Sequence, residues 1–305
     1  MYYAIENART KKIGVDEISL KDKHRYFGFV GMDDREAVFQ KLGLSYGAVH
    51  EMAENKSLAY ENHEGFDLIS LSILNHKSLF AHGNRVYIYL HKNILLFICA
   101  DTASVTAMMH GIAQTDADVE FDRILGIFFE RLTADDVSFL DRIEQETSDL
   151  ENALITSKKR NCVKEIISLR KRLMVFKRYY EQLLNVLDEL QENENNIVSG
   201  TALRHFKIYA AKVERLYHSV LNLRDYVTQV REAYQAEVDI SLNNIMKLFT
   251  VITAIFLPLT LIVGWYGMNL QMPEFQWPLG YPMVILLSVC VVVFCLVYFK
   301  KNKWF

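Results

Sequence analysis

Three threonines recur on one face of an apolar run near the C-terminus, residues 248–266. Counting back from Thr260 in alternating steps of three and four residues gives a stripe that contains all three: Thr260, Leu257, Thr253, Thr250, Met246, Asn243, Asp239, Ala236 and Glu232. A polar side chain inside a bilayer is unfavourable unless it faces a water-filled cavity or a partner. We therefore expect this stripe, called the pore stripe below, to line a water-filled path. The alternative is that each threonine hydroxyl bonds back to a carbonyl of its own helix.

The run that carries the threonines is one of two, residues 248–266 and 283–299, and each is long enough to cross a bilayer. Of the 34 + 37 = 71 charged residues, only Glu274 lies between positions 248 and 299. Each run spans about 26 to 29 Å as a helix, close to the hydrocarbon thickness of a bilayer. A pair of buried helices in a soluble core is the alternative. It explains less well the C-terminal position and the aromatic residues at the ends of the runs: Trp265, Tyr266, Trp277, Tyr281, Tyr298, Phe299 and Trp304.

The lysines predict the orientation of this helical hairpin. Lys247 precedes the first run, and Lys300, Lys301 and Lys303 follow the second, whereas the loop between the runs has no Lys or Arg. The positive-inside rule then places both termini in the cytoplasm of a multi-pass protein of the cell membrane. We expect a cytosolic α/β domain (1–118), a helical stalk region (119–247), a pore-lining helix (248–266), an outer loop (267–282), a second membrane helix (283–299) and a basic cytosolic tail (300–305).

The predicted cytosolic body changes character along its length. Residues 86–90 and 94–98 read as an antiparallel hairpin around a polar turn, and residues 34–42 and 104–113 as helices. From position 127 to 257 the only Gly or Pro is Gly200, which indicates long helices over 134–159, 163–192 and from Ser199 or Thr201 without a break into the membrane. Such a helix is too long to be buried within one chain, so it predicts a stalk that packs against its own domain and against copies of itself. The acidic segment 188–196 is either a solvated turn or a cation-attracting site near a pore mouth.

Composition excludes several classes of function. A net charge of −3 argues against a strongly basic nucleic-acid-binding body, and the four cysteines show no disulfide or zinc spacing. No nucleotide-binding G-x-x-x-x-G-K-[ST] motif occurs, so no nucleotide cofactor and no ATP hydrolysis are expected. A charged body joined to an almost uncharged tail also argues against a simple globular enzyme. The first residues have no apolar stretch that would indicate a signal peptide.

A short motif follows the first apolar run: Tyr266-Gly267-Met268-Asn269, then Met272-Pro273-Glu274-Phe275. With Phe256-Leu-Pro-Leu-Thr260 before it and a large body upstream, the chain resembles the CorA-type magnesium channel family, in which Leu is usual at the position of Phe275. The resemblance implies a funnel-shaped homopentamer whose α+β cytosolic domains and long helical stalk precede two membrane helices, the first lining the pore. Independently, one helical hairpin cannot enclose a water-filled path, so a ring of copies is required.

The resemblance also assigns roles in the pore. It implies a selectivity filter at Gly267, Met268 and Asn269, with Asn269 contacting hydrated Mg²⁺, polar rings at Thr260 and Asn243, and a hydrophobic gate at Met246 and Phe249, where the family usually has Leu. Neutral Asn oxygens suit Mg²⁺, which loses its water shell reluctantly and must also be released. Glu274 would attract cations outside, although a solvent-facing loop acid is an equal alternative. Lys300, Lys301 and Lys303 would form a cytosolic basic ring.

The implied function is uptake of divalent cations, Mg²⁺ first and also Co²⁺ or Ni²⁺, driven by the membrane potential. Cytosolic divalent ions between subunits would close the pore. Carboxylates that could bind them, or could simply lie on a solvated surface, are Asp33, Asp34, Asp135, Asp136 and Glu232. One alternative is the zinc-transporting branch of the family, which tends to vary the residue at Met268. Another is a membrane-anchored coiled-coil sensor that conducts nothing, for which a stripe of polar residues would be unnecessary.

Overall fold

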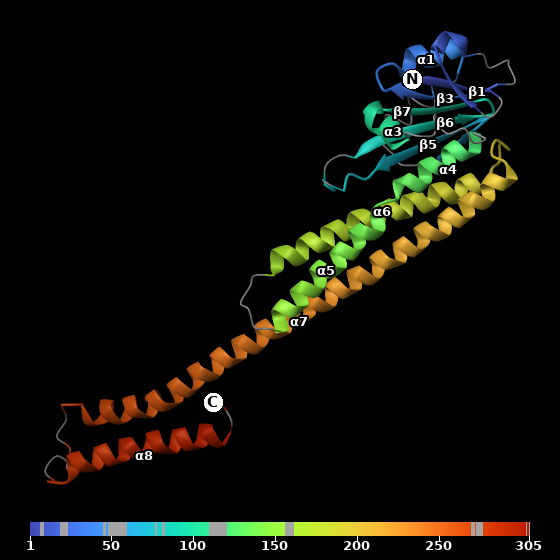
Figure 1. Ribbon diagram of the computed structural model, residues 1–305. Helices are drawn as coiled ribbons and strands as arrows, with labels where there is room; N and C mark the ends of the chain where they lie inside the picture. The colour runs from blue at the N-terminus through green and yellow to red at the C-terminus, as the bar shows by residue number, and fades with distance from the viewer. Residues whose placement is uncertain are drawn as a thin grey trace. The chain divides into compact units, whose positions relative to one another are not determined.

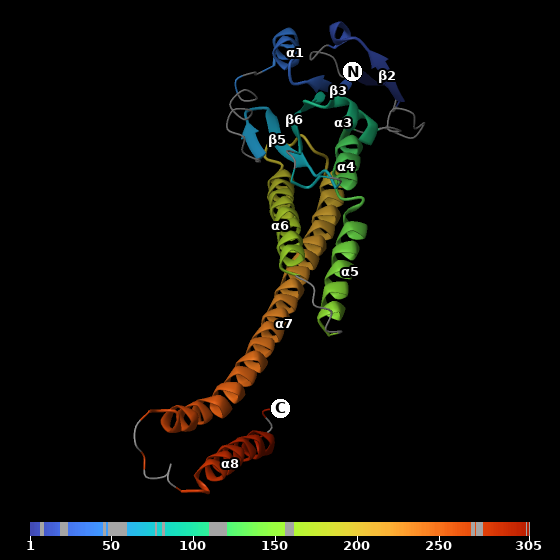
Figure 2. The same ribbon diagram turned by 90° about the vertical axis from the view of Figure 1, so that its left-hand side faces the viewer.

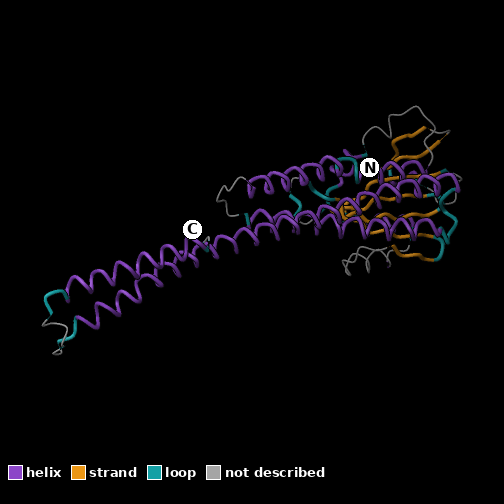
Figure 3. Tube along the Cα trace, turned by 90° about the horizontal axis from the view of Figure 1, so that it is seen from below, coloured by secondary structure: helices purple, strands orange, loops and turns teal. Residues whose placement is uncertain are grey.

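The computed structural model describes residues 1–6, 9–18, 24–44, 47, 60–76, 78–80, 83–109, 121–155, 162–269, 272, 277–302 and 304. The chain forms two compact units, Met1–Val230 and Arg231–Phe305. All the strands that the structure describes belong to the first unit, and the second unit is helical (Figure 3). The expected order of an α+β domain, a long helix and two apolar helices is therefore confirmed.

The first unit contains a seven-stranded sheet in the order β2-β1-β3-β7-β6-β5-β4 (Figure 1). Its strands are β1 (Tyr2–Glu6), β2 (Arg9–Ile13), β3 (Arg25–Gly31), β4 (Tyr60–His63), β5 (Phe66–Ile73), β6 (Asn84–His91) and β7 (Ile94–Cys99). The predicted hairpin is confirmed: β6 pairs antiparallel with β7, and His91 lies opposite Ile94 across the turn. β3 pairs parallel with β7, whereas all the other pairings are antiparallel.

Helices cover both faces of this sheet. On one face α1 (Arg35–Leu42) packs Phe39 edge-on against Tyr89 of β6, with ring centroids 5.1 Å apart. On the other face α4 (Phe121–Leu132) places Phe128 5.0 Å from Phe97 of β7. A short helix, α3 (Thr102–Met108), follows β7 and is capped by Asp101, whose Oδ1 accepts from the Ser104 amide. Alternate residues of β7 thus enter two separate apolar layers, as expected of a central strand.

Three longer helices form a bundle below the sheet (Figure 2). They are α5 (Asp136–Ile155), α6 (Val163–Glu192) and α7 (Gly200–Tyr266), of which residues up to Val230 belong to this unit. The predicted bounds of α6 are confirmed, as is the cap of α7, where Ser199 Oγ accepts from the Ala202 amide at 3.3 Å. The predicted residues 110–120 and 156–161 lie outside the described part. Helix α7 has 67 residues, about 100 Å of continuous helix.

The turn between α6 and α7 docks onto the sheet through Asn195. Its Nδ2 donates to Asp67 Oδ1 at 2.7 Å and to the His63 carbonyl at 2.8 Å, both on the β4–β5 hairpin. The residues on either side, Asn193 and Asn196, have φ angles of 47° and 53°, which only a small set of residues adopts readily. The acidic side chains of segment 188–196 are exposed, as expected of a solvated turn: Asp188, Glu189, Glu192 and Glu194. The same turn also docks onto the sheet through Asn195. It precedes the first residue of α7, whereas the apolar run forms the last part of that helix, so a site near a pore mouth is not indicated.

We expect Asn195→Ala to destabilise the first unit by about 2 kcal/mol, because it leaves the nearly buried Asp67 carboxylate without its amide donor. The midpoint of thermal unfolding of the full chain in detergent, followed by circular dichroism, should fall by roughly 4 to 8 °C. Glu194→Ala is the matched control, because it removes only the exposed bond from Asn62 Nδ2 at the same turn. Equal midpoints for Asn195→Ala and the parent would contradict the docking role.

The second unit is a pair of helices. Helix α8 (Gly280–Lys301) runs back beside the last part of α7 (Figures 1 and 3). Pro258 has no amide hydrogen, so the Ala254 carbonyl lacks its usual donor within α7. Cys295 of α8 fills this gap, with its Sγ 3.8 Å from the Ala254 oxygen. Both helices are long and apolar enough to cross a membrane, and only 6% of the most apolar stretch of each is buried, unlike a core helix of a soluble protein.

Candidate functional site

The pore stripe lies on the face of α7 that α8 leaves uncovered. The side chains toward α8 are buried or half-buried: Val251, Ala254, Ile255, Pro258, Leu259 and Ile262. At about 100° per residue, Thr253, Leu257 and Thr260 lie on the other side of the helix. All members of the stripe from Glu232 to Thr260 are exposed, with Met246 at 62% and Leu257 at 71%. A single copy of the chain therefore leaves this whole face available to water or to another copy.

The threonine hydroxyls of the stripe donate to their own helix. Thr250 Oγ1 donates to the Met246 carbonyl at 2.8 Å, and Thr260 Oγ1 to the Phe256 carbonyl at 2.8 Å. Thr253 likewise donates to the Phe249 carbonyl at 2.9 Å. The alternative, that each threonine hydroxyl bonds to a carbonyl of its own helix, is therefore confirmed. These bonds do not exclude that the stripe lines a water-filled path. A hydroxyl that donates inward keeps its oxygen lone pairs, which can accept from a water molecule bound to a cation.

The exposed face continues as a groove toward the end of the helix. The groove has a volume of about 690 Å³ and contains Thr253, Leu257, Thr260, Gly264 and Met268, which follow one another at helical spacing. Met268 is 38% exposed, and Asn269 beside it is exposed. Thr253, Thr260 and Met268 therefore line one continuous groove of the second unit, next to the exposed Asn269.

Gly267 ends helix α7 with a close backbone contact. Its amide donates to the Val263 carbonyl at 2.9 Å, and a Cβ atom at this position would lie only 2.8 Å from that oxygen. Contacts below 3.0 Å between a real Cβ and a backbone atom essentially do not occur. Glycine is needed here for space, so that Met268 and Asn269 can leave the helix where they do.

We expect Gly267→Ala to lower Mg²⁺ uptake at least about tenfold, because the added methyl group would push the backbone of Met268 and Asn269 away from Val263. Val289→Ala is the control, since Val289 is an exposed residue of α8 outside the groove. Uptake by both variants into cells, normalised to protein in the membrane, is the measurement. Parent-like uptake by Gly267→Ala would show that the close approach is dispensable.

The predicted hydrophobic gate and basic ring are described only in part. Phe249 is 59% exposed but lies about 60° around the helix from Met246, so the two are neighbours rather than members of one line. Lys300 and Lys301 are exposed at the end of α8. Glu274 and Lys303 lie outside the described residues.

The candidate regulatory carboxylates do not gather in the described part of one chain. No group of three or more His, Cys, Asp or Glu residues there could hold a metal ion. Asp136 is fully buried: its Oδ1 lies 2.7 Å from His76 Nε2, and its Oδ2 accepts from the Tyr180 hydroxyl at 2.8 Å. A solvated surface position for Asp136 is therefore wrong. Sequence reasoning missed this contact because its partners are 60 and 44 residues away.

These features define a class: membrane proteins in which an α+β body continues through one long helix into a C-terminal hairpin of apolar helices. A family described as CorA-like Mg²⁺ transporter protein matches residues 31–301, so the chain belongs to that family.

Comparison with known proteins agrees with this assignment. The chain is 30% identical to a cobalt/magnesium transport protein CorA of Thermotoga maritima over 60% of this chain and 52% of that protein. It is 28% identical to one of Methanocaldococcus jannaschii over 95% of this chain and 94% of that protein. The solved structure of the CorA magnesium transporter from M. jannaschii superposes with a TM-score of 0.82 at 22% identity, covering 100% of this chain and 99% of that one. The superposition shows that the fold is shared.

Proposed function

We propose that the chain is the subunit of a channel that carries divalent cations, Mg²⁺ first, across a membrane. The observation that carries this proposal is the exposed, uncharged face of α7 away from α8, on which Thr250, Thr253 and Thr260 lie and which continues as a groove to Met268. The names of the similar proteins, which specify magnesium or cobalt and magnesium transport, support the choice of ion.

The proposed assembly is a ring of five copies with α7 inside and α8 outside. A path for hydrated ions needs a closed wall, and one pair of helices cannot provide it. In such a ring, the hydroxyl oxygens of Thr250, Thr253 and Thr260 and the Asn269 amide oxygens would accept hydrogen bonds from the water shell of Mg²⁺. They carry no charge, so they would hold the ion weakly enough to release it.

The driving force in this proposal is the membrane potential. With both termini in the cytoplasm, an inward-moving divalent cation gains about 4.6 kcal/mol per 100 mV of inside-negative potential. No nucleotide would be consumed. Regulatory Mg²⁺ would bind between copies, where carboxylates of two chains can converge.

Reconstituted vesicles would test the function directly. We expect Mg²⁺ influx, reported by a fluorescent indicator inside the vesicles, to rise with an inside-negative K⁺ diffusion potential. Sizing in mild detergent should give about 5 × 35.4 = 177 kDa of protein. Faster Zn²⁺ than Mg²⁺ flux would favour the zinc-transporting alternative. A well-formed ring that passes no divalent cation would favour a sensor without a conducting path.

A further inference from the structure

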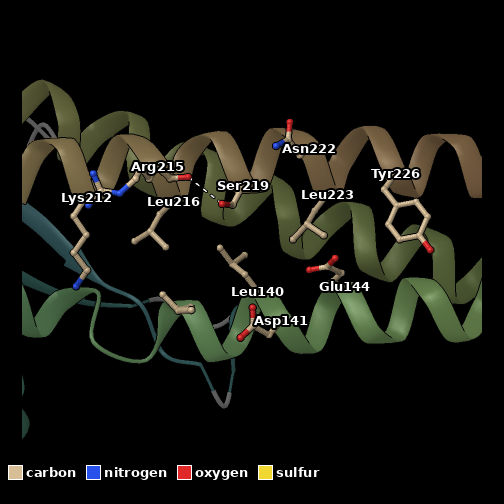
Figure 4. Close-up of a pocket in the computed structure, with 11 residues that line it drawn as sticks. Leu140, Asp141, Glu144, Lys212, Arg215, Leu216, Ser219, Asn222, Leu223 and Tyr226 are labelled. Atoms are coloured by element: carbon tan, nitrogen blue, oxygen red, sulfur yellow. Dashed lines mark hydrogen bonds between the residues drawn. The ribbon is translucent and has the colours of Figure 1, made fainter.

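The helical bundle of the first unit carries a groove between α5 and α7, with α6 behind it (Figure 4). The groove has a volume of about 600 Å³. Its floor is formed by Leu140, Leu216 and Leu223. Its α5 rim carries two carboxylates, Asp141 and Glu144, neither of which forms an ion pair with any residue that the structure describes.

The opposite side of the same bundle carries a ridge on α6. Val163, Ile167 and Met174 project there with exposures of 43, 47 and 51%, at spacings of four and seven residues that place them on one line. Basic residues flank this line: Lys164, Arg170, Lys171 and Arg178. Within the described ranges, Arg170 and Lys171 form no ion pair. The buried face of α6, which includes Leu173 and Phe176, points the other way, toward α5 and α7.

A cyclic ring with an odd number of copies must use two different surfaces at each contact, because a self-complementary surface closes only pairs. The α5–α7 groove and the α6 ridge are two different surfaces on opposite sides of one bundle. Their lengths agree: the α7 side of the groove extends from Lys212 to Tyr226, about 21 Å, and the ridge from Val163 to Met174, about 17 Å.

The charges of the ridge are complementary to only one rim of the groove. The α7 rim of the groove is basic, at Lys212 and Arg215, so it repels other basic residues. Lys212 also lies 6.0 Å over the Tyr209 ring of its own chain. The basic residues of the ridge are therefore attracted to the acidic α5 rim. We propose that the α6 ridge of one copy docks into the α5–α7 groove of the next copy, with Arg170 and Lys171 against Asp141 and Glu144. This inference rests on the proposed ring and names the contact that joins its cytosolic parts.

Pairwise cysteine cross-linking of the full chain in detergent tests the contact. In a background with Cys290 and Cys295 replaced by serine, Met174→Cys on the ridge is combined with Ser219→Cys in the groove. A short bifunctional thiol reagent should then give a ladder up to five chains. Met174→Cys alone should stay monomeric on a denaturing gel, because the ridge does not meet itself. Met174→Cys with Asp149→Cys, on an exposed part of α5 outside the groove, is the matched control and should give no ladder.

The outcomes separate this inference from the proposed function. A ring of normal size that conducts Mg²⁺ but gives no Met174–Ser219 ladder would overturn the docking contact and leave the channel intact; the groove would then be covered by something else. Cross-linking of Met174→Cys alone would overturn it too, since it shows ridge against ridge. Absence of any ring in the cysteine-replaced parent would contradict the proposed function itself.

Charge reversal gives an independent readout. Asp141→Lys with Glu144→Lys should lower the equilibrium constant for assembly about fivefold or more per contact, measured by dilution and sizing. Arg170→Glu with Lys171→Glu should do the same. The chain that carries all four changes should recover most of the loss, because each copy then supplies both reversed surfaces. Additive losses in the fourfold variant would rule out pairing of these groups.

Discussion

Replacing Asn269 with alanine should reduce Mg²⁺ uptake at least tenfold while leaving the ring and the fold unchanged. Asn269 is exposed immediately after α7 ends, and its side chain forms no hydrogen bond with the described residues, so its loss costs no stability. In the proposed ring, its amide oxygens accept hydrogen bonds from water bound to Mg²⁺. A hydrogen bond to a charged group contributes about 1.5 to 3 kcal/mol, and each 1.4 kcal/mol is a factor of about ten.

Uptake by a strain that depends on added magnesium is the measurement for this prediction. Asn302→Ala is the matched control, because Asn302 is an exposed asparagine at the other end of the hairpin, after α8. Asn269→Asp adds information: a carboxylate ring binds Mg²⁺ more tightly and releases it more slowly, so uptake should fall while block by external Mg²⁺ strengthens. Parent-like uptake by Asn269→Ala would remove Asn269 from the selectivity site.

The second large effect concerns stability. Asp136→Ala should destabilise the first unit by about 3 kcal/mol, because it leaves the buried Tyr180 hydroxyl without its acceptor and creates a cavity. The unfolding midpoint of the full chain in detergent should fall by roughly 6 to 12 °C. Burial and the neighbouring Asp136 raise the pKa of Tyr180 well above its ordinary value, so this hydroxyl stays protonated and needs an acceptor at any ordinary pH.

A double-mutant cycle assigns that loss to the hydrogen bond. Tyr180→Phe should be less damaging than Asp136→Ala, because it keeps the ring and leaves Asp136 paired with His76. If the bond is responsible, the two substitutions together should cost less than the sum of their separate effects. Strict additivity would point instead to the cavity alone. Asp141→Ala, an exposed acid on the same helix, is the control and should change the midpoint little.

The features that sequence alone predicted are those set by neighbouring residues. The bounds of α6, the cap at Ser199 and the β6–β7 hairpin follow from local turn and capping preferences and from hydrophobic spacing. The contacts that it missed join distant segments: Asn195 to Asp67 across 128 residues, and Asp136 to His76 and Tyr180. Nothing in the local pattern distinguishes such a buried carboxylate from a solvated one, because its environment comes from other elements.

The candidate site also combines features that the sequence predicts with features that only the structure shows. The spacing of the threonines was enough to predict an uncovered face, because a helix fixes the direction of each side chain from its position in the sequence. The space restriction at Gly267 required coordinates, since it depends on where the Val263 carbonyl lies.

The Cys295 thiol of α8 contacts the Ala254 carbonyl of α7, so a movement of α7 at this point changes a contact with α8. Proline removes one hydrogen bond from the ladder of α7 at Ala254, and this is the natural point for the helix to bend. Because the Cys295 thiol interacts with the freed carbonyl, a bend that draws Ala254 away from α8 exposes an unpaired oxygen to lipid, and the bilayer penalises that exposure. The contact from Cys295 thus opposes a bend of α7 at Pro258.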